Sequence, residues 1–254
     1  MRRAQYGRLL TEAYDLDKPT APADELAYYL GAIDQAPPPV LAVMCGSGRF
    51  LLPILARGVD IDGVDASSDM LAACRANALE LGVEPSLHQQ QLHELALPRT
   101  YGLVFIGGNS IGLVADLDEL REGLRRMHAH LMPGGHLLLE IQTPPAPPPH
   151  RGRNAWRGTW WTRTNGDRIV LRQIGDYDPA TRIETGLGIY DLYEGSTLAA
   201  TELNDWIHRY WDPGDFSDEL AAAGFDDIQL TRAFTDDELT GDEGTVSVRC
   251  RRPR

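Results

Sequence analysis

The stretch AVMCGSGRFL, residues 42–51, decides the fold that we expect for this chain. Its two glycines, Gly46 and Gly48, end the apolar run PVLAVMC (39–45), and a helix-like pattern, RFLLPILARG (49–58), follows at once. A strand, a Gly-x-Gly turn and a helix bring backbone N–H groups and a helix N-terminus to the carboxyl edge of a sheet, where α/β folds bind ligands. The glycine spacing alone is a weak signal, because a tight connection without a ligand gives the same pattern.

Strand-like and helix-like segments alternate on both sides of that turn. Apolar runs bounded by turn residues predict strands at 39–45, 59–67, 85–92, 101–108, 136–144, 226–234 and 244–252. Helical spacing predicts helices at 24–33, 49–58, 68–82, 116–135 and 212–225, with Ser68 as the N-cap of the third. Repeated strand–helix units imply a parallel sheet with helices on both faces.

One segment breaks this rhythm. The run PPAPPP at 144–149 fits neither a helix nor a central strand, so we expect a stiff extended crossing there. Beyond it, residues 156–211 carry turn signals at Asn165-Gly166, Asp178-Pro179 and Glu194-Gly195, which predict an antiparallel sheet of three or four strands. The expected fold class is therefore α/β: a Rossmann-like doubly wound, mostly parallel sheet with a small antiparallel β cap inserted after the fifth strand.

Composition argues against several classes of function. The 254 residues carry a net charge of −13 at pH 7, which would repel phosphate backbones and anionic lipid, so no nucleic acid and no membrane is expected as a partner. Three scattered cysteines fit a reducing compartment rather than a disulfide framework. No run approaches the ~18 apolar residues of a membrane span, and the first residues lack the pattern of a signal peptide, so a cytoplasmic location is expected. The seven histidines lack ligand spacing, and no metal is predicted.

Asp65 points to a nucleoside ligand. It ends the strand predicted at 59–67, about 20 residues after the glycines, where such folds place an acid that accepts both ribose hydroxyls. The dinucleotide fingerprint also needs a third glycine three residues after Gly48, and this chain has Leu51 there. This difference argues against NAD or FAD, and hence against a nicotinamide oxidoreductase.

These features resemble the class I S-adenosylmethionine-dependent methyltransferases. The matching motifs are CGSGRF at 45–50, VDASSDML at 64–71, GGNSIG at 107–112 and LMPGGHLLLE at 131–140. Within that family, VDASSDML together with the GNS turn is most similar to the glycine N-methyltransferase and aminosugar N,N-dimethyltransferase branch. We expect four parts: an N-terminal helical lid (1–37), a cofactor-binding core (38–143), an antiparallel β substrate cap (144–211), and a C-terminal helix with the last two core strands (212–254).

The resemblance also implies which residues hold S-adenosylmethionine. Gly46 and Gly48 would contact its methionine portion, Asp65 the ribose diol, and the carbonyl of Gly107 the ammonium. The other residues implied are Met44 on the floor of the methionine site, Tyr14 closing over it, and Ala66, Met70, Gln91 and Leu92 around the adenine. For Met70 and Leu92 a simple core role is the competing interpretation.

Ala42 departs from the family pattern, which usually has Asp or Glu at this position to help hold the methionine ammonium. Losing one hydrogen bond to a charged group costs roughly 1.5–3 kcal/mol, or about ten- to a hundredfold in affinity. Asn109 or backbone carbonyls could compensate. A cofactor-binding protein of this fold without methyl transfer activity therefore stays open.

Transfer of a methyl group from a sulfonium is an in-line displacement, so the protein mainly positions the reactants and excludes water. Aminosugar relatives carry a His three residues after the Ser of the GNS-like turn, and this chain has Leu113 there, so no strong base is predicted at that position. Asn109 and Ser110 are expected to orient the substrate. Among the histidines, His208 on a cap strand is the candidate proton acceptor.

All five tryptophans fall in the cap region, and most of them are expected to form the core of its small sheet. Trp156, Trp160 and Tyr210 are the candidate substrate contacts, because aromatic walls suit an amine cation or a flat ring. The function expected is methylation of a small molecule, with an amine ahead of a hydroxyl. O-methylation of a small hydroxylated metabolite is the alternative, and a homodimer is an open option.

Overall fold

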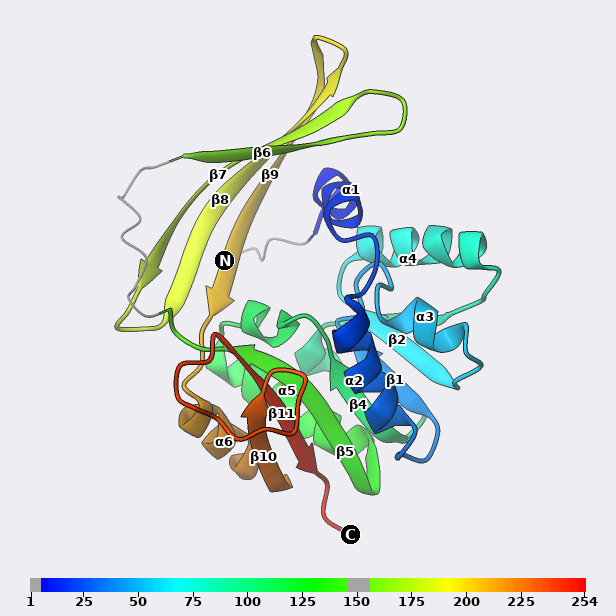
Figure 1. The fold of residues 1–254 in the computed structure, drawn as a ribbon, viewed down its shortest axis with the longest axis vertical. Coiled ribbons are helices and arrows are strands. Elements are labelled where there is room, and N and C mark those ends of the chain that lie inside the picture. The colour runs from blue at the N-terminus through cyan, green and yellow to red at the C-terminus, as the bar shows by residue number, and fades with distance from the viewer. Residues whose placement is uncertain (1–5, 146–155) are drawn as a thin grey trace.

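The computed structural model describes residues 6–145 and 156–254, so most of the proline run expected to form a stiff crossing lies outside the described residues. Figure 1 shows two parts, a helix-covered sheet and a separate curved sheet, with one helix lying between them. The elements are α1 (Arg8–Asp17), α2 (Ala23–Ile33), β1 (Val40–Val43), α3 (Leu51–Leu55), β2 (Ile61–Asp65), α4 (Ser68–Leu81), β3 (Ser86–Gln89), η1 (Leu92–Glu94), β4 (Tyr101–Ile106), η2 (Ser110–Leu113), α5 (Leu117–His130), β5 (Leu131–Gln142), β6 (Arg157–Thr162), β7 (Arg168–Asp178), β8 (Ile183–Glu194), β9 (Thr197–Arg209), α6 (Pro213–Ala222), β10 (Asp226–Arg232) and β11 (Thr245–Arg251).

The larger sheet has seven strands in the order β10-β11-β5-β4-β1-β2-β3. Strands β1 to β5 pair in parallel, β11 runs antiparallel to β5, and β10 runs antiparallel to β11. The strand order reverses between β1 and β4, which creates a crevice at their carboxyl ends. The predicted fold class, with the smaller antiparallel sheet inserted after β5, is confirmed.

Helices cover both faces of this sheet, because its central strands β1 and β4 are apolar and buried along their whole length. On one face, Tyr29 and Ile33 of α2 pack with buried residues of α3 and α4. On the other, Leu120 and Leu124 of α5 pack with buried residues of α6. Within the described residues, no helix combines the length and the apolar character that a bilayer crossing would need.

Two local predictions were wrong. Ser67, not Ser68, caps α4: its side chain accepts a hydrogen bond from the amide of Met70 at 3.1 Å, three residues on, as N-cap geometry requires. The helix predicted to reach residue 135 ends at His130, because Leu131 is already extended and opens β5. The Pro-Gly-Gly sequence therefore lies inside the strand, where Gly134 takes a φ of 81°.

The smaller sheet, which we call the cap, consists of β6 to β9 in consecutive antiparallel order. Helix α1 lies between the cap and the larger sheet (Figure 1). Glu202 of β9 accepts hydrogen bonds from the first amides of α1, at 2.9 and 3.3 Å, and Arg163 makes a two-pronged ion pair with Glu12. On its other side, Asp15 of α1 accepts a hydrogen bond from Asn77 of α4. Helix α1 thus ties the cap to the core.

Candidate active site

A cavity of about 330 Å³ lies at the carboxyl ends of β1, β2 and β4, beside the point where the strand order reverses. The core, α1 and β9 all contribute to its wall. The cavity brings together twelve of the residues singled out from the sequence: Tyr14, Met44, Gly46, Asp65, Ala66, Met70, Gln91, Leu92, Gly107, Asn109, Ser110 and His208.

The turn after β1 is held from the neighbouring strand. The amide of Gly46 donates to Oδ2 of Asp65 at 2.8 Å, and the amide of Ser67 donates to Oδ1 at 2.9 Å. Burial raises the pKa of the Asp65 carboxyl, and these amides partly oppose that shift. Met44 and Gly46 both take left-handed backbone conformations, with φ of 54° and 58°. For Met44 this conformation is strained, as often occurs where backbone is shaped for a ligand.

The two glycines of the turn have different reasons to be glycine. Gly46 lines the cavity, and a Cβ there would face only the sulfur of Met70, 3.8 Å away. Gly48 lies outside the cavity lining, and a Cβ there would sit 2.7 Å from both Cys74 and Leu52. Gly48 thus lets the turn pack against α3 and α4, whereas Gly46 leaves space for a ligand.

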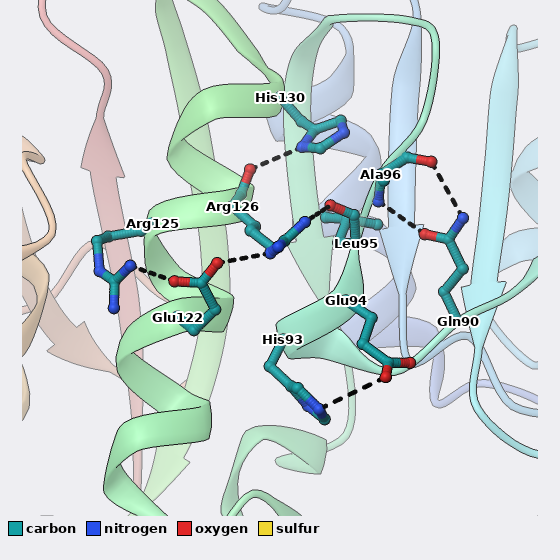
Figure 2. Close-up of polar contacts among 9 residues, drawn as sticks. All are labelled: Gln90, His93, Glu94, Leu95, Ala96, Glu122, Arg125, Arg126 and His130. Atoms are coloured by element: carbon teal, nitrogen blue, oxygen red, sulfur yellow. Dashed lines mark hydrogen bonds and ion pairs between the residues drawn. The ribbon is translucent and has the colours of Figure 1, made fainter.

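The loop after β3 forms the side of the cavity next to Asp65. Figure 2 shows how it is braced: the side chain of Gln90 bonds both main-chain groups of Ala96, and Arg126 of α5 donates to the carbonyl of Leu95 at 3.1 Å. The loop therefore presents Gln91 and Leu92 to the cavity from a fixed backbone. Leu92 is 6% exposed and belongs to the main core as well, so both interpretations of this residue apply at once.

The turn after β4 carries an acceptor without a partner. Asn109 has a left-handed backbone, with φ of 57°, and its Oδ1 atom is buried without a hydrogen bond within the described residues. The hydroxyl of Ser110 donates to the carbonyl of Gly107 at 2.8 Å. Ser110 is therefore engaged in shaping the turn, while the Gly107 carbonyl keeps one lone pair for a further donor.

A buried carboxyl lies beneath this turn. Glu140 of β5 has no exposed surface, and it accepts a hydrogen bond from the hydroxyl of Tyr29, which also contacts the carbonyl of Ile106 at 3.2 Å. Burial raises the pKa of Glu140 to about 7, against the opposing hydrogen bonds from Tyr29 and the amide of Asn109. Glu140 thus anchors the backbone that presents Asn109.

His208 reaches the cavity from the cap. Its ring lies so close to Gly112 that a Cβ on that residue would collide with it, and within the described residues it makes no hydrogen bond. Burial lowers the pKa of His208, and the carboxylate of Glu184, its cross-strand partner, partly opposes this. An imidazole whose pKa is lowered by burial, and whose Nε2 has no hydrogen-bond partner among the described residues, therefore lies beside the turn that ends at Leu113.

Three expected substrate contacts lie outside the cavity lining. Trp156 is 52% exposed and Trp160 is 66% exposed. Side chains alternate along β6, and Trp161 packs with the cluster that buries α1, so Trp160 faces the opposite side of the cap. Tyr210 stands behind His208, with ring centroids 4.8 Å apart, and donates to Glu184 at 2.8 Å.

The expectation that most tryptophans form the core of the cap was also wrong. Trp211 is buried in the main core against Phe216, whereas Trp161 and Trp206 are the two that pack within the cap region.

Among the cavity-lining residues that sequence reasoning missed are Tyr6, Lys18 and Arg49. Arg49 directly follows Gly48, so its position next to the glycine turn was a usable signal. Lys18 is the only lysine of the chain and gave no signal beyond that count. Tyr6 precedes α1, and its carbonyl accepts a hydrogen bond from Ser67 at 2.7 Å, a contact that no sequence pattern announces.

The residues present fit S-adenosylmethionine. Asp65 offers a fixed carboxylate to a ribose diol, Gly46 leaves room for a ligand against the backbone, and the unpartnered Oδ1 of Asn109 suits an ammonium donor. Within the described residues there is no group of three or more His, Cys, Asp or Glu that could hold a metal ion.

Comparisons with known proteins agree with this geometry. Residues 40–135 match the family model described as a methyltransferase domain. A dTDP-3-amino-3,6-dideoxy-alpha-D-glucopyranose N,N-dimethyltransferase of Streptomyces fradiae is 31% identical over 101 residues, 40% of this chain and 38% of that protein. A ubiquinone biosynthesis O-methyltransferase of Cronobacter sakazakii (strain ATCC BAA-894) is 27% identical over 137 residues, 53% of this chain and 50% of that protein. These two alignments span half or less of each relative.

Solved structures extend the likeness to the whole chain. The amino pentose methyltransferase CalS10 of Micromonospora echinaspora, solved with S-adenosylmethionine bound, superposes with a TM-score of 0.64 over 99% of this chain and 100% of that one, at 19% identity. Residues 40–135 thus form a methyltransferase domain; the protein is an S-adenosylmethionine-dependent methyltransferase, and S-adenosylmethionine is its cofactor.

Proposed function

We propose that this methyltransferase methylates the nitrogen of a small-molecule amine, with His208 accepting the proton that the amine gives up. The observation that carries the proposal is the unpartnered imidazole in the cavity wall, beside the turn that holds Asn109. The expectation of no strong base rested on Leu113 alone, and His208 approaches the same turn from a different element.

The chemistry needs a neutral amine, because only a nitrogen with its lone pair free can attack carbon. S-adenosylmethionine supplies the methyl group on a sulfonium, and its C–S bond breaks as the new N–C bond forms. Most alkylamines are protonated near pH 7, so an acceptor for one proton is needed for each methyl group transferred. Burial lowers the pKa of His208, which favours the neutral imidazole, the form that has a lone pair for this proton.

Glu184 would stabilise the imidazolium that results. It lies opposite His208 in the register of β8 and β9, is 6% exposed, and accepts a hydrogen bond from Tyr210 at 2.8 Å. A carboxylate in this cross-strand position favours the charged form of the imidazole after proton transfer. Tyr210 would position this pair rather than contact the substrate.

The N,N-dimethyltransferase of Streptomyces fradiae methylates the nitrogen of an aminosugar, and CalS10 is an amino pentose methyltransferase, which supports an amine acceptor for this chain. A hydroxyl acceptor is the second candidate, since one relative is an O-methyltransferase and a histidine base would serve an alcohol equally. A cytoplasmic location, in line with the three free cysteines, belongs to the same proposal, and a homodimer stays an open option.

The test replaces His208 by Gln and follows formation of S-adenosylhomocysteine with a panel of small amines and hydroxylated compounds. General-base catalysis typically contributes 10²–10⁴-fold, so His208→Gln should lower kcat by at least about a hundredfold with an amine. The part of the acidic limb of the pH–rate profile that follows His208 should disappear with it, leaving only the limb set by protonation of the amine itself. His93→Gln is the matched control, because His93 lines the other side of the cavity, and it should keep turnover within about threefold.

Turnover with alcohols or phenols alone would replace the amine by a hydroxyl acceptor. An unchanged pH profile in His208→Gln would remove His208 from the mechanism.

A further inference from the structure

The guanidinium of Arg49 lines the cavity without a committed partner. Within the described residues it makes no ion pair and no hydrogen bond, and its Nε atom is buried. It lies over the ring of Phe50, with 4.8 Å between its central carbon and the ring centroid, and 6.0 Å from the ring of Tyr14. Ring contacts of this kind hold the guanidinium in place but leave its N–H groups unused.

The position of Arg49 is the methionine end of the cofactor site. A Cβ on Gly108 would lie 2.9 Å from an Nη atom of Arg49, and Phe50 packs against Gly107 in the same way at 2.8 Å. The guanidinium is thus next to the turn that carries the unpartnered Oδ1 of Asn109. The guanidinium of Arg49 and the Oδ1 atom of Asn109 thus lie close together, both without a hydrogen-bond partner among the described residues. They match the carboxylate and the ammonium of an amino-acid group.

The charges on the cavity wall also favour an anionic group next to Arg49. Among the described residues that line the cavity, Asp65 is the only carboxylate, and it lies at the ribose position. Glu25 lies outside the lining; burial raises the pKa of its carboxyl, and the charge of Arg49 is the main influence that lowers it. At the methionine end the wall therefore carries positive charge, although the chain as a whole is at −13.

We propose that Arg49 binds the carboxylate of the methionine portion of S-adenosylmethionine, and that this contact takes over the anchoring that an acid at position 42 gives elsewhere in the family. Ala42 lies in an apolar cluster with Phe50 and Phe105 and offers no charge to the ammonium. A planar guanidinium can grip a carboxylate with two parallel N–H groups, which a point charge cannot do. The proposal concerns cofactor recognition and is independent of the methyl acceptor.

The arrangement makes a specific demand on the ligand. A cofactor bound through its ammonium should tolerate loss of the carboxylate, whereas one bound through Arg49 should not. The carboxylate and the ammonium can be separated experimentally, because decarboxylated S-adenosylhomocysteine keeps the amine, the thioether and the nucleoside. Comparing the two ligands isolates the group that Arg49 contacts.

The experiment is calorimetric titration of the unchanged protein and of Arg49→Gln with S-adenosylhomocysteine and with its decarboxylated analogue. Arg49→Gln should weaken binding of S-adenosylhomocysteine by about ten- to a hundredfold and change binding of the analogue less than about twofold. Arg49→Lys, which keeps the charge but not the fork, should fall between the two. Thermal unfolding of each variant reports whether it is folded.

Lys18→Gln is the matched control. Lys18 also lines the cavity and lies 5.4 Å from the ring of Tyr14, but its side chain is exposed. Lys18→Gln should change the affinity for S-adenosylhomocysteine and the affinity for its decarboxylated analogue by the same factor. Equal losses for both ligands in Arg49→Gln, no loss for either, or selectivity that follows Lys18 instead would each overturn the assignment. None of these outcomes depends on turnover, so the amine proposal and the Arg49 proposal fail separately.

Discussion

The core and the cap contribute to the cavity in different ways. The core supplies backbone that its own side chains hold in place: Asp65 fixes the Gly46 turn and the tip of β2, Gln90 fixes the loop after β3, and Ser110 shapes the turn at Asn109. The cap supplies one side chain to the lining, His208, together with the helix α1 that it holds through Glu202 and Arg163. Cofactor recognition therefore depends on main-chain geometry, and acceptor chemistry depends on single side chains.

This difference suits an enzyme family in which the donor is constant and the acceptor varies. The parallel strand ladder and the few side chains that hold the turns fix the cofactor half, so it keeps its shape when other residues are replaced. A cap strand can exchange one side chain without disturbing the core, because its polar groups are paired within the cap. The variants described next test whether cofactor binding by the core and acceptor chemistry at the cap can be altered independently.

The largest expected effect is at Asp65. Asp65→Ala removes a carboxylate placed for two charge-assisted hydrogen bonds to a ribose diol, so affinity for S-adenosylhomocysteine should fall by about a thousandfold, as calorimetry would measure. The variant also loses the acceptor for the Gly46 amide, and Asp65→Asn, which retains one acceptor oxygen, should lose less. Asp69→Asn, an exposed carboxylate on α4, should bind normally. Normal binding by Asp65→Ala would place the ribose elsewhere.

Glu140 gives the next largest effect, on stability. Its pKa is raised from 4.5 to about 7, so the folded protein holds this proton to a higher pH than the unfolded chain does. The unfolding free energy must then fall as pH rises from about 4.5 to about 7, by an amount on the order of 3 kcal/mol, and stay level above that range.

Glu140→Gln removes the titrating group, so its stability relative to the unchanged protein should rise across the same pH window. Urea unfolding at several pH values between 4.5 and 8 would measure that difference. Glu80→Gln, which removes an exposed carboxylate on α4, should show no such trend. A constant difference between Glu140→Gln and the unchanged protein would mean that Glu140 does not stay protonated above its ordinary range in the fold.

The same contrast explains which parts of the molecule the sequence could predict. Gly46 and Asp65 stand about 20 residues apart because a strand–turn–helix–strand unit has a fixed length, so their meeting follows from spacing alone. His208 reaches Gly112 across 96 residues, through the curvature of a sheet whose packing no local pattern encodes. Its role was retained as a candidate only because histidine is a suitable base. Arg49 was missed although it adjoins Gly48, because spacing does not reveal which way a side chain turns.

The smallest expected effect separates two adjacent cap residues. Trp160 is 66% exposed on the outer face of the cap, so Trp160→Ser should leave cofactor affinity and turnover within about twofold of the unchanged protein. Trp161 faces α1 and donates to Asp17 at 3.1 Å, so Trp161→Ser should loosen the helix that carries Tyr14 and weaken cofactor binding several-fold. Calorimetry and steady-state kinetics on both variants measure these changes.

A loss of turnover in Trp160→Ser at constant oligomeric state would show that the outer face of the cap takes part in the reaction. A loss accompanied by a fall in molar mass in solution would instead place that face between two copies of the chain.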